Sequence, residues 1–275
     1  TTVFAVLLGS FLPRFLHVQD EARAARLLQA YGEVSAAIRT THATALTRQS
    51  GLMREMQIVA NNIANLSTTG FRKEGVVFAE HVASLRGDEP SLSMASAEGR
   101  VVNLSQGVLE KTGGAFDFAI EGEGFFQVAA PEGNELTRAA AFVLSPEGVL
   151  VTAEGFPVLD GGSSPITVPV DAGPISVSRD GTLSAGGAPL AQLGLYRPVD
   201  PSTLVHTSGT RFRTDGDIEP VEGGSIFQGF LENSNVNAVQ EVSRMIEVQR
   251  AYEMGQGFLE SEDSRIRSVI QTLGR

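Results

Sequence analysis

The sequence contains no cysteine and no tryptophan. Without cysteine the chain has no disulfide framework, no thiolate nucleophile and no cysteine-ligated metal site. Basic residues are scarce as well, because 21 Lys and Arg stand against 32 Asp and Glu, for a net charge of −11. Proteins that bind a phosphate backbone need clustered Lys and Arg, so the composition predicts no nucleic-acid partner.

Long apolar runs are also missing. The most apolar stretch, Val3 to Val18, is interrupted by Pro13 and Arg14 and is shorter than the roughly 20 residues that span a bilayer. A secretory signal peptide carries its positive charge before the apolar run, whereas Arg14 comes late in this stretch. We therefore expect no membrane insertion and no cleaved signal peptide.

The motifs of common enzyme classes are absent from the sequence. There is no Gly-x-Ser-x-Gly elbow and no phosphate-binding loop ending in Lys-Ser or Lys-Thr. Gly122 and Gly124 begin a dinucleotide fingerprint, but Gln127 stands where the third glycine belongs. The histidines, none in the spacing of a helical metal site, are His17, His42, His81 and His206. The sequence predicts no catalytic residue, no cofactor and no metal site, and hence no enzyme.

Two groups of acidic residues are the remaining candidates for chemistry. Asp215, Asp217 and Glu219 could bind a hard cation, but carboxylates beside a glycine are more often a solvated turn. Asp117 and Glu121 could act as paired carboxylates in a secreted cell-wall hydrolase, which is the remote alternative from another functional class.

The middle of the chain has the pattern of short strands joined by tight turns. Between Glu98 and Gly223 the sequence contains ten Asp-Gly or Glu-Gly steps. Alternation over Phe116–Ile120 predicts a half-buried strand, and residues 142–144, 149–151 and 166–170 are further short apolar runs. We predict a β-rich domain over residues 106–214.

Helical periodicity occurs toward both ends of the chain. The expected C-terminal seam is Val242, Met245, Gln249, Tyr252, Gln256, Leu259, Asp263, Ile266, Ile270 and Leu273. The expected N-terminal seam is Leu46, Gln49, Met53, Met56, Ala60 and Ile63. Polar seam positions favour helices that pair in a coiled-coil-like stalk. Helices lying flat on the β core remain the alternative.

These patterns predict an α+β fold in which paired terminal helices surround an inserted, mostly β domain. The helical stalk would comprise residues 40–71 with 232–275. Residues 72–105 with 215–231 would connect it to the β-rich domain. A protease-resistant core is expected over about residues 72–230. Residues 1–39 would be an atypical N-terminal extension, in which Asp20 caps a helix.

Asparagine-rich junctions flank the inserted middle. Asn61-Asn62-Ile63-Ala64-Asn65 ends the first helix and leads into Ser67-Thr68-Thr69-Gly70-Phe71, which is typical of a turn. Asn233-Ser234-Asn235-Val236-Asn237 precedes the C-terminal helix and is consistent with N-capping.

The two junctions resemble the signatures of the flagellar axial family of the bacterial rod and hook. Asn61 to Phe71 resembles the N-terminal signature. Ser234 to Asn237, together with Met245-Ile246-Glu247-Val248-Gln249-Arg250-Ala251-Tyr252-Glu253, resembles the C-terminal one. The similarity runs from about Ala43 to Arg275, and the short β middle is more similar to a rod subunit than to a hook subunit.

The resemblance implies a structural subunit of the proximal rod, with a distal rod or other axial sibling as the alternative. It also implies export through the flagellar type III apparatus without a cleaved signal peptide, and helical assembly with itself and other rod subunits in the basal body. The implied assembly residues are Asn61, Asn62, Ile63, Asn65, Thr69, Gly70, Phe71, Asn235, Val236, Asn237, Met245, Ile246, Gln249, Arg250, Tyr252, Leu259 and Ile266.

Overall fold

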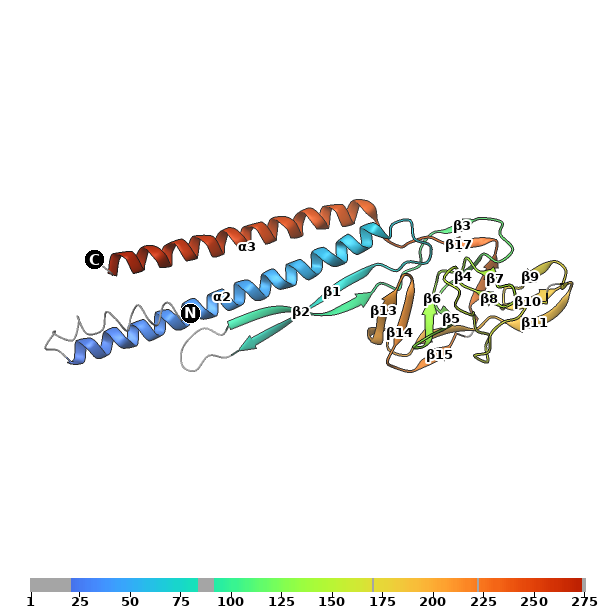
Figure 1. The fold of residues 1–275 in the computed structure, drawn as a ribbon, viewed down its shortest axis with the longest axis horizontal. Helices are drawn as coiled ribbons and strands as arrows, with labels where there is room; N and C mark the ends of the chain where they lie inside the picture. The colour runs from blue at the N-terminus through green and yellow to red at the C-terminus, as the bar shows by residue number, and fades with distance from the viewer. Residues whose placement is uncertain (1–20, 84–91, 170, 222, 274–275) are drawn as a thin grey trace. The chain divides into compact units, whose positions relative to one another are not determined.

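The computed structural model describes residues 21–83, 92–169, 171–221 and 223–273. Helix α2 covers Glu21–Ala64, helix α3 covers Ala238–Leu273, and the chain between them is mostly β (Figure 1). The expected α+β class is confirmed. Asp20, expected as a helix cap, lies outside the described residues, and α2 runs without a break through residue 39.

The strands between the helices are short except for the first two. They are β1 (Glu74–Ala83), β2 (Leu92–Val102), β3 (Leu109–Lys111), β4 (Phe118–Glu121), β5 (Phe125–Ala130), β6 (Gly133–Thr137), β7 (Val143–Leu144), β8 (Leu150–Val151), β9 (Ile175–Val177), β10 (Thr182–Ala185), β11 (Ala188–Gln192), β12 (Leu195–Pro198), β13 (Leu204–Ser208), β14 (Arg211–Thr214), β15 (Ile218–Pro220), β16 (Ser225–Gln228) and β17 (Phe230–Glu232). A 3-10 turn, η1, covers Pro201–Thr203.

The largest sheet has the strand order β13-β14-β6-β5-β12-β15, and a three-stranded sheet has the order β11-β10-β9. The remaining described strands form pairs: β1 with β2, β3 with β17, β4 with β16, and β7 with β8. Because β15, β16 and β17 pair with strands of residues 106–214, segment 215–231 is part of the β structure. Its prediction as a separate connector was wrong.

The main core lies among the short strands. It is formed by Phe118, Ile120, Phe126, Val128, Ala140, Phe142, Leu150, Val158, Ile166, Val168, Leu183, Leu193, Leu195 and Ile226. The strand predicted over Phe116–Ile120 begins at Phe118 and is fully buried over its first three residues, so the alternating pattern was misleading. Ile166 is buried between Pro165 and the bridge-forming Thr167, but no strand covers residues 166–169. The prolines on either side lack the N–H that a ladder needs.

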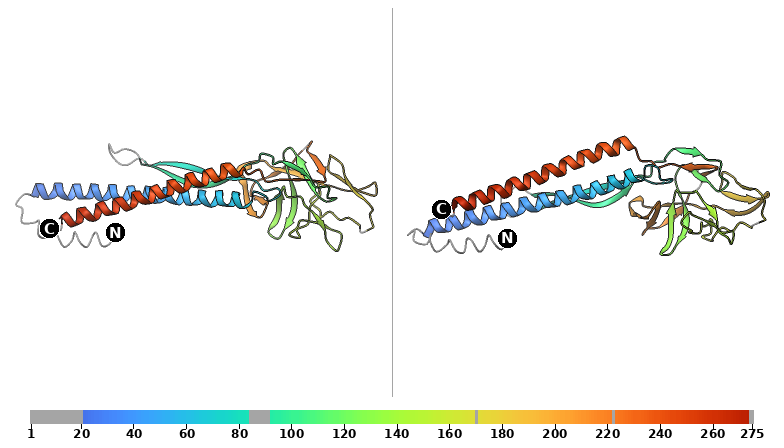
Figure 2. Two further views of the ribbon diagram at one scale, coloured as in Figure 1. Left: turned by 90° about the horizontal axis from the view of Figure 1, so that it is seen from above. Right: turned by 45° about the horizontal axis from the view of Figure 1, so that its top comes forward.

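The chain divides into two compact units. Among the described residues, the helical unit contains residues 21–54, 78–83, 92–97 and 247–273, and the β unit contains residues 55–77, 98–169, 171–221 and 223–246. Each long helix therefore has one end in the helical unit and the other end in the β unit. Within the helical unit α2 and α3 lie side by side (Figure 2), and a Cβ on Gly255 would lie 3.6 Å from Gln49 Cγ.

The less exposed face of α3 differs from the predicted seam at every second position. Its members are Glu241, Met245, Val248, Tyr252, Gly255, Leu259, Glu262 and Ile266. Gln249, Gln256 and Asp263 are exposed. Successive residues of the observed face are four and then three positions apart along α3, whereas those of the predicted seam are three and then four positions apart. The two sets therefore share every other residue. The polar residues used to argue for pairing on α3 are therefore outside the contact face, whereas Gln49 on α2 is half-buried.

The seam predicted on α2 was also wrong in part. Leu46 is 57% exposed and Met53 is 49% exposed. The buried positions are Gly51, Glu55, Ile58, Val59 and Asn62. Periodicity of apolar residues missed this face because it includes two polar side chains, which obtain partners only in the folded chain.

Candidate functional site

The end of α2 is built from small polar side chains. Asn65 donates from Nδ2 to the Asn61 carbonyl oxygen at 2.9 Å, and the Thr68 hydroxyl donates to Asn65 Oδ1 at 3.0 Å. The Asn65 N–H also keeps its helical bond to the Asn61 carbonyl oxygen at 3.2 Å, so the side-chain bonds hold the turn that follows the last helical residues. Gly70 follows with φ 70°, and a Cβ there would lie 2.2 Å from the Ala139 nitrogen. Position 70 therefore requires glycine for two reasons: the positive φ disfavours other residues, and the neighbouring backbone leaves no room for a Cβ.

Asn62 joins three segments of the β unit. Its Nδ2 donates to the Glu74 carbonyl oxygen at 2.9 Å, and its Oδ1 accepts from the Glu74 N–H at 2.9 Å. Nδ2 also donates to Glu241 Oε2 at 3.0 Å, across 179 residues of sequence. The side-chain amide thus pairs with β1 as a neighbouring strand would, and it connects α2 to the first turn of α3.

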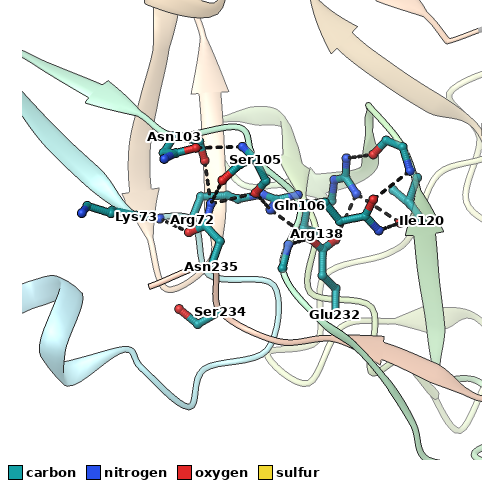
Figure 3. Close-up of polar contacts among 12 residues, drawn as sticks. Arg72, Lys73, Asn103, Ser105, Gln106, Ile120, Arg138, Glu232, Ser234 and Asn235 are labelled. Atoms are coloured by element: carbon teal, nitrogen blue, oxygen red, sulfur yellow. Dashed lines mark hydrogen bonds and ion pairs between the residues drawn. The ribbon is translucent and has the colours of Figure 1, made fainter. Parts of the chain in front are cut away.

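A buried charge cluster lies where β17 passes the end of this turn (Figure 3). Glu232 Oε1 is 2.8 Å from Arg72 Nη1, and Glu232 Oε2 is 2.9 Å from Arg138 Nη1. The three side chains are at most 2% exposed. Burial lowers the pKa of Arg138 to about 10 and also lowers the pKa of Arg72, while the Glu232 carboxylate opposes both shifts. One carboxylate therefore compensates two buried guanidinium groups.

Asn235 binds the backbone of two other segments (Figure 3). Its Oδ1 accepts from the Lys73 N–H at 2.6 Å, and its Nδ2 donates to the carbonyl oxygens of Asn103 at 3.0 Å and Ser105 at 2.8 Å. Only Asn237 caps α3, because its Oδ1 accepts from the Gln240 N–H at 3.1 Å. The expected N-capping by this asparagine-rich segment is thus confirmed at Asn237, while Asn235 binds backbone groups outside the helix.

The first turns of α3 are held by ion pairs within the β unit. Glu241 Oε1 is 2.5 Å from Lys73 Nζ, and Arg244 Nε donates to Glu55 Oε1 at 2.6 Å. Glu241 and Val248 are each only 2% exposed. The acidic side chain in the first turn also complements the positive end of the helix dipole. We call the contacts described above the polar junction. Its principal members are Asn62, Arg72, Lys73, Arg138, Glu232, Asn235 and Glu241.

The structure brings together most of the predicted residues near the two asparagine-rich segments. Asn62, Gly70 and Phe71 are buried, while the partly buried members are Asn61, Ile63, Asn65, Thr69, Asn235 and Val236. The predicted residues farther along α3 are not part of the junction. Met245, Tyr252, Leu259 and Ile266 are half-buried, whereas Ile246, Gln249 and Arg250 are exposed.

The sequence analysis missed the charged members of the junction, namely Arg72, Lys73, Arg138, Glu232 and Glu241. One signal was available for three of them, because Arg72 and Lys73 directly follow the first asparagine-rich segment and its turn, and Glu232 directly precedes the second segment. What could not be read was their pairing, since Glu232 lies 94 residues from its partner Arg138.

Within the described ranges, no group of three or more His, Asp or Glu is placed to hold a metal ion. Among the helices that the structure describes, none is long and apolar enough to cross a membrane. The geometry is that of a packed joint between chain segments.

Comparison with known families matches three stretches of the chain. Residues 40–72 match the model of the flagella basal body rod protein, residues 119–185 the FlgE/F/G D1 domain of the flagellar hook protein, and residues 228–272 the C-terminal region of flagellar basal body rod FlgEFG proteins. The flagellar basal-body rod protein FlgF of Caulobacter vibrioides is 41% identical over 236 residues, which cover 84% of this chain and 96% of that protein. This chain belongs to the flagellar basal-body rod protein family. It is a structural rod subunit, and the two asparagine-rich sides of its polar junction fall in the first and last matched stretches.

Two further rod proteins show how the similarity is distributed. FlgF of Rhizobium meliloti is 35% identical, with 84% of this chain and 96% of that protein covered. FlgG of Agrobacterium fabrum is 30% identical, with 84% of this chain and 98% of that protein covered. Both FlgF proteins named here are more similar to this rod protein than the FlgG protein is.

Proposed function

We propose that this rod protein is a subunit of the proximal rod and that its copies join neighbouring rod subunits in a helical drive shaft for motility. The higher identity to the FlgF relatives than to the FlgG relative supports the proximal position over the distal one. Repeated head-to-tail contacts that do not close into a ring generate an open helical array.

The observation that carries the assembly proposal is a second apolar face on α3. Val239 is 76% exposed and Met254 is 70% exposed, and Val242, Ile246 and Phe258 are more than 40% exposed. Most of these positions lie opposite the face formed by Val248, Gly255 and Leu259. A surface helix normally keeps such a face polar. Burial of each large side chain contributes about 1.5–3 kcal/mol, so a neighbouring subunit that covers this face stabilises the shaft.

We further propose coiled-coil-like pairing of α2 and α3 in the assembled rod, and export through the type III apparatus without a cleaved signal peptide. The pairing is supported by the approach of Gln49 to Gly255 and by the Arg244–Glu55 ion pair, each within its own unit. Export by this route is supported by membership in the rod family. The partners are then the export apparatus and other rod subunits, with no nucleic acid and no membrane insertion.

A catalytic role finds little support in the proposed acidic pair. The Asp117 carboxylate accepts a hydrogen bond from the Thr112 hydroxyl at 2.5 Å, which commits it to a local turn, and Glu121 is exposed at the end of β4. The matched relatives are structural rod proteins. We therefore propose that the chain is not an enzyme.

The assembly proposal is tested by placing charge on the exposed apolar face. In a flagellated strain that depends on this protein, Met254→Asp with Phe258→Asp should abolish recovery of the protein in purified basal bodies and abolish swimming. The control, Gln256→Asp with Gln271→Asp, adds the same charge to exposed polar positions of the same helix and should leave incorporation unchanged. Normal incorporation of the first variant would refute the role of this face.

A further inference from the structure

A polar contact interrupts the face between α2 and the start of α3. Asn62 is 1% exposed and Glu241 is 2% exposed, and their side chains meet at 3.0 Å within the β unit. Neither position is apolar, although the same helix faces carry Ile58 and Val248 nearby. The contact therefore requires an explanation beyond packing.

The apolar positions alone leave the register of the helices ambiguous. The contact face of α3 repeats every seven residues, as in Met245, Tyr252, Leu259 and Ile266. A shift of α3 by seven residues, about 10 Å along its axis, presents the same kind of face to α2. Hydrophobic burial is non-directional and distinguishes weakly between such registers.

The Asn62–Glu241 contact does not repeat in this way. The residue seven positions after Glu241 is Val248, and Gly255 follows seven positions later. The Asn62 amide cannot rotate to find another partner, because both its oxygen and its nitrogen bind the backbone of Glu74. The other Glu241 oxygen is taken by Lys73 Nζ. A shifted helix would remove the Glu241 carboxylate from both of its partners, and would leave one N–H of the buried Asn62 amide and the Lys73 ammonium without that acceptor, which is unfavourable.

We infer that Asn62 and Glu241 are positioning residues that fix the register of α3 against α2. A single buried polar pair is an effective register device because every wrong register leaves it unsatisfied. The consequence for the rod rests on the proposed function, since the register of α3 decides at which height its exposed apolar face meets the next subunit. The register itself is a property of the single chain.

The absence of cysteine allows register to be read by disulfide trapping. Gln49→Cys with Gly255→Cys reports the native register, because a Cβ at position 255 lies 3.6 Å from Gln49 Cγ. Gln49→Cys with Val248→Cys, or with Glu262→Cys, reports a shift of one repeat to either side. In the otherwise unchanged chain, only the 49–255 pair should form a disulfide under mild oxidation.

The decisive variant replaces the polar pair with apolar residues, as Asn62→Leu with Glu241→Leu. We expect the 49–255 disulfide yield to fall at least threefold and a disulfide to appear in one of the shifted pairs, while the circular dichroism of the β unit is kept. An unchanged yield confined to the 49–255 pair would overturn the inference. If the double variant does not fold, Glu241→Leu alone leaves both bonds from Asn62 to Glu74 intact and is judged by the same yields.

Two controls separate register from other effects. Glu260→Leu adds the same side chain at an exposed position of α3 and should leave the trapping pattern unchanged. Glu241→Gln keeps an acceptor for Asn62 and should retain the 49–255 disulfide. All yields are measured on the isolated chain, so their outcome is independent of rod incorporation. A native trapping pattern combined with normal incorporation of the Met254→Asp, Phe258→Asp variant would count against the proposed assembly face alone.

Discussion

At the scale of single residues, Gly70 satisfies two constraints at once. Its backbone has a positive φ, and a Cβ would lie 2.2 Å from backbone atoms of the segment that carries Arg138. Gly113 has a similar φ of 78° but open space around it. Substitutions at Gly70 and Gly113 therefore separate the cost of a positive φ from the cost of a steric clash with the added Cβ.

We expect Gly70→Ala to lower the free energy of unfolding by about 3 kcal/mol or more, because strain and overpacking add. Gly113→Ala should cost only about 1 kcal/mol, from φ alone. Urea unfolding of both variants measures the difference. Equal costs would mean that the approach of the Ala139 backbone relaxes without penalty.

The charge cluster of the polar junction gives a second prediction at the residue scale. Glu232→Gln removes the carboxylate that Arg72 and Arg138 share, and leaves two buried guanidinium groups without a counter-charge. Loss of one partner of a buried pair costs about 3–5 kcal/mol, so the variant should be strongly destabilised in urea unfolding. Glu110→Gln, which changes an exposed carboxylate bound to Asn233, is the control and should be near neutral. A near-neutral Glu232→Gln would show that water enters the cluster.

At the scale of elements, α3 has a different role on each of its faces. Met245, Tyr252, Leu259 and Ile266 lie on the face turned toward the chain itself, while Val239 and Met254 are turned outward. Apolar periodicity identified the shared positions of the inner face but not its full phase. The two phases differ at four positions and each contains a single large apolar residue, a valine: the observed set is Glu241, Val248, Gly255 and Glu262, and the predicted set is Val242, Gln249, Gln256 and Asp263.

Leu259→Asp with Ile266→Asp should prevent incorporation into the rod while the β unit stays folded. Both positions are half-buried on the inner face of α3, and the variant would bury two carboxylates without partners. Glu260→Asp with Arg267→Asp, one residue along at exposed positions, should be much milder. Immunoblots of basal bodies and the circular dichroism of the purified variants measure the two effects. Equal incorporation of both variants would contradict an inner face here.

At the scale of the whole molecule, the division into units does not follow the ends of the helices. The β unit includes residues 55–64 at the end of α2 and the first turns of α3 up to residue 246. Ion pairs from Lys73 to Glu241 and from Glu55 to Arg244 hold those turns. The core is thus wider than the range of residues 72–230 that turn-rich patterning predicts.

Limited proteolysis of the isolated chain should therefore leave a trypsin-resistant fragment that retains Arg244 and ends at the exposed Arg250. Local opening of the docked turns requires breaking buried contacts, whereas the exposed helix beyond them is cut more readily. Mass spectrometry of the fragments locates the cut. A resistant fragment that ends before residue 238 would restore the narrower core.

Residue patterns along the chain were enough to predict the α+β class, the helical character near both ends, the turn-rich middle and the two asparagine-rich motifs. These depend on local conformation, such as glycine in tight turns and amides at helix ends, or on motifs contiguous in the chain. Three further features depend on the folded chain: Asn62 binds Glu74 and Glu241, two arginines share Glu232, and one phase of α3 is buried. Those outcomes depend on pairing between residues more than 90 positions apart in several cases, and on burial that makes an unpaired charge costly. Apolar periodicity carries no information about such partners, because a polar residue in a core position is stable only when its partner is present.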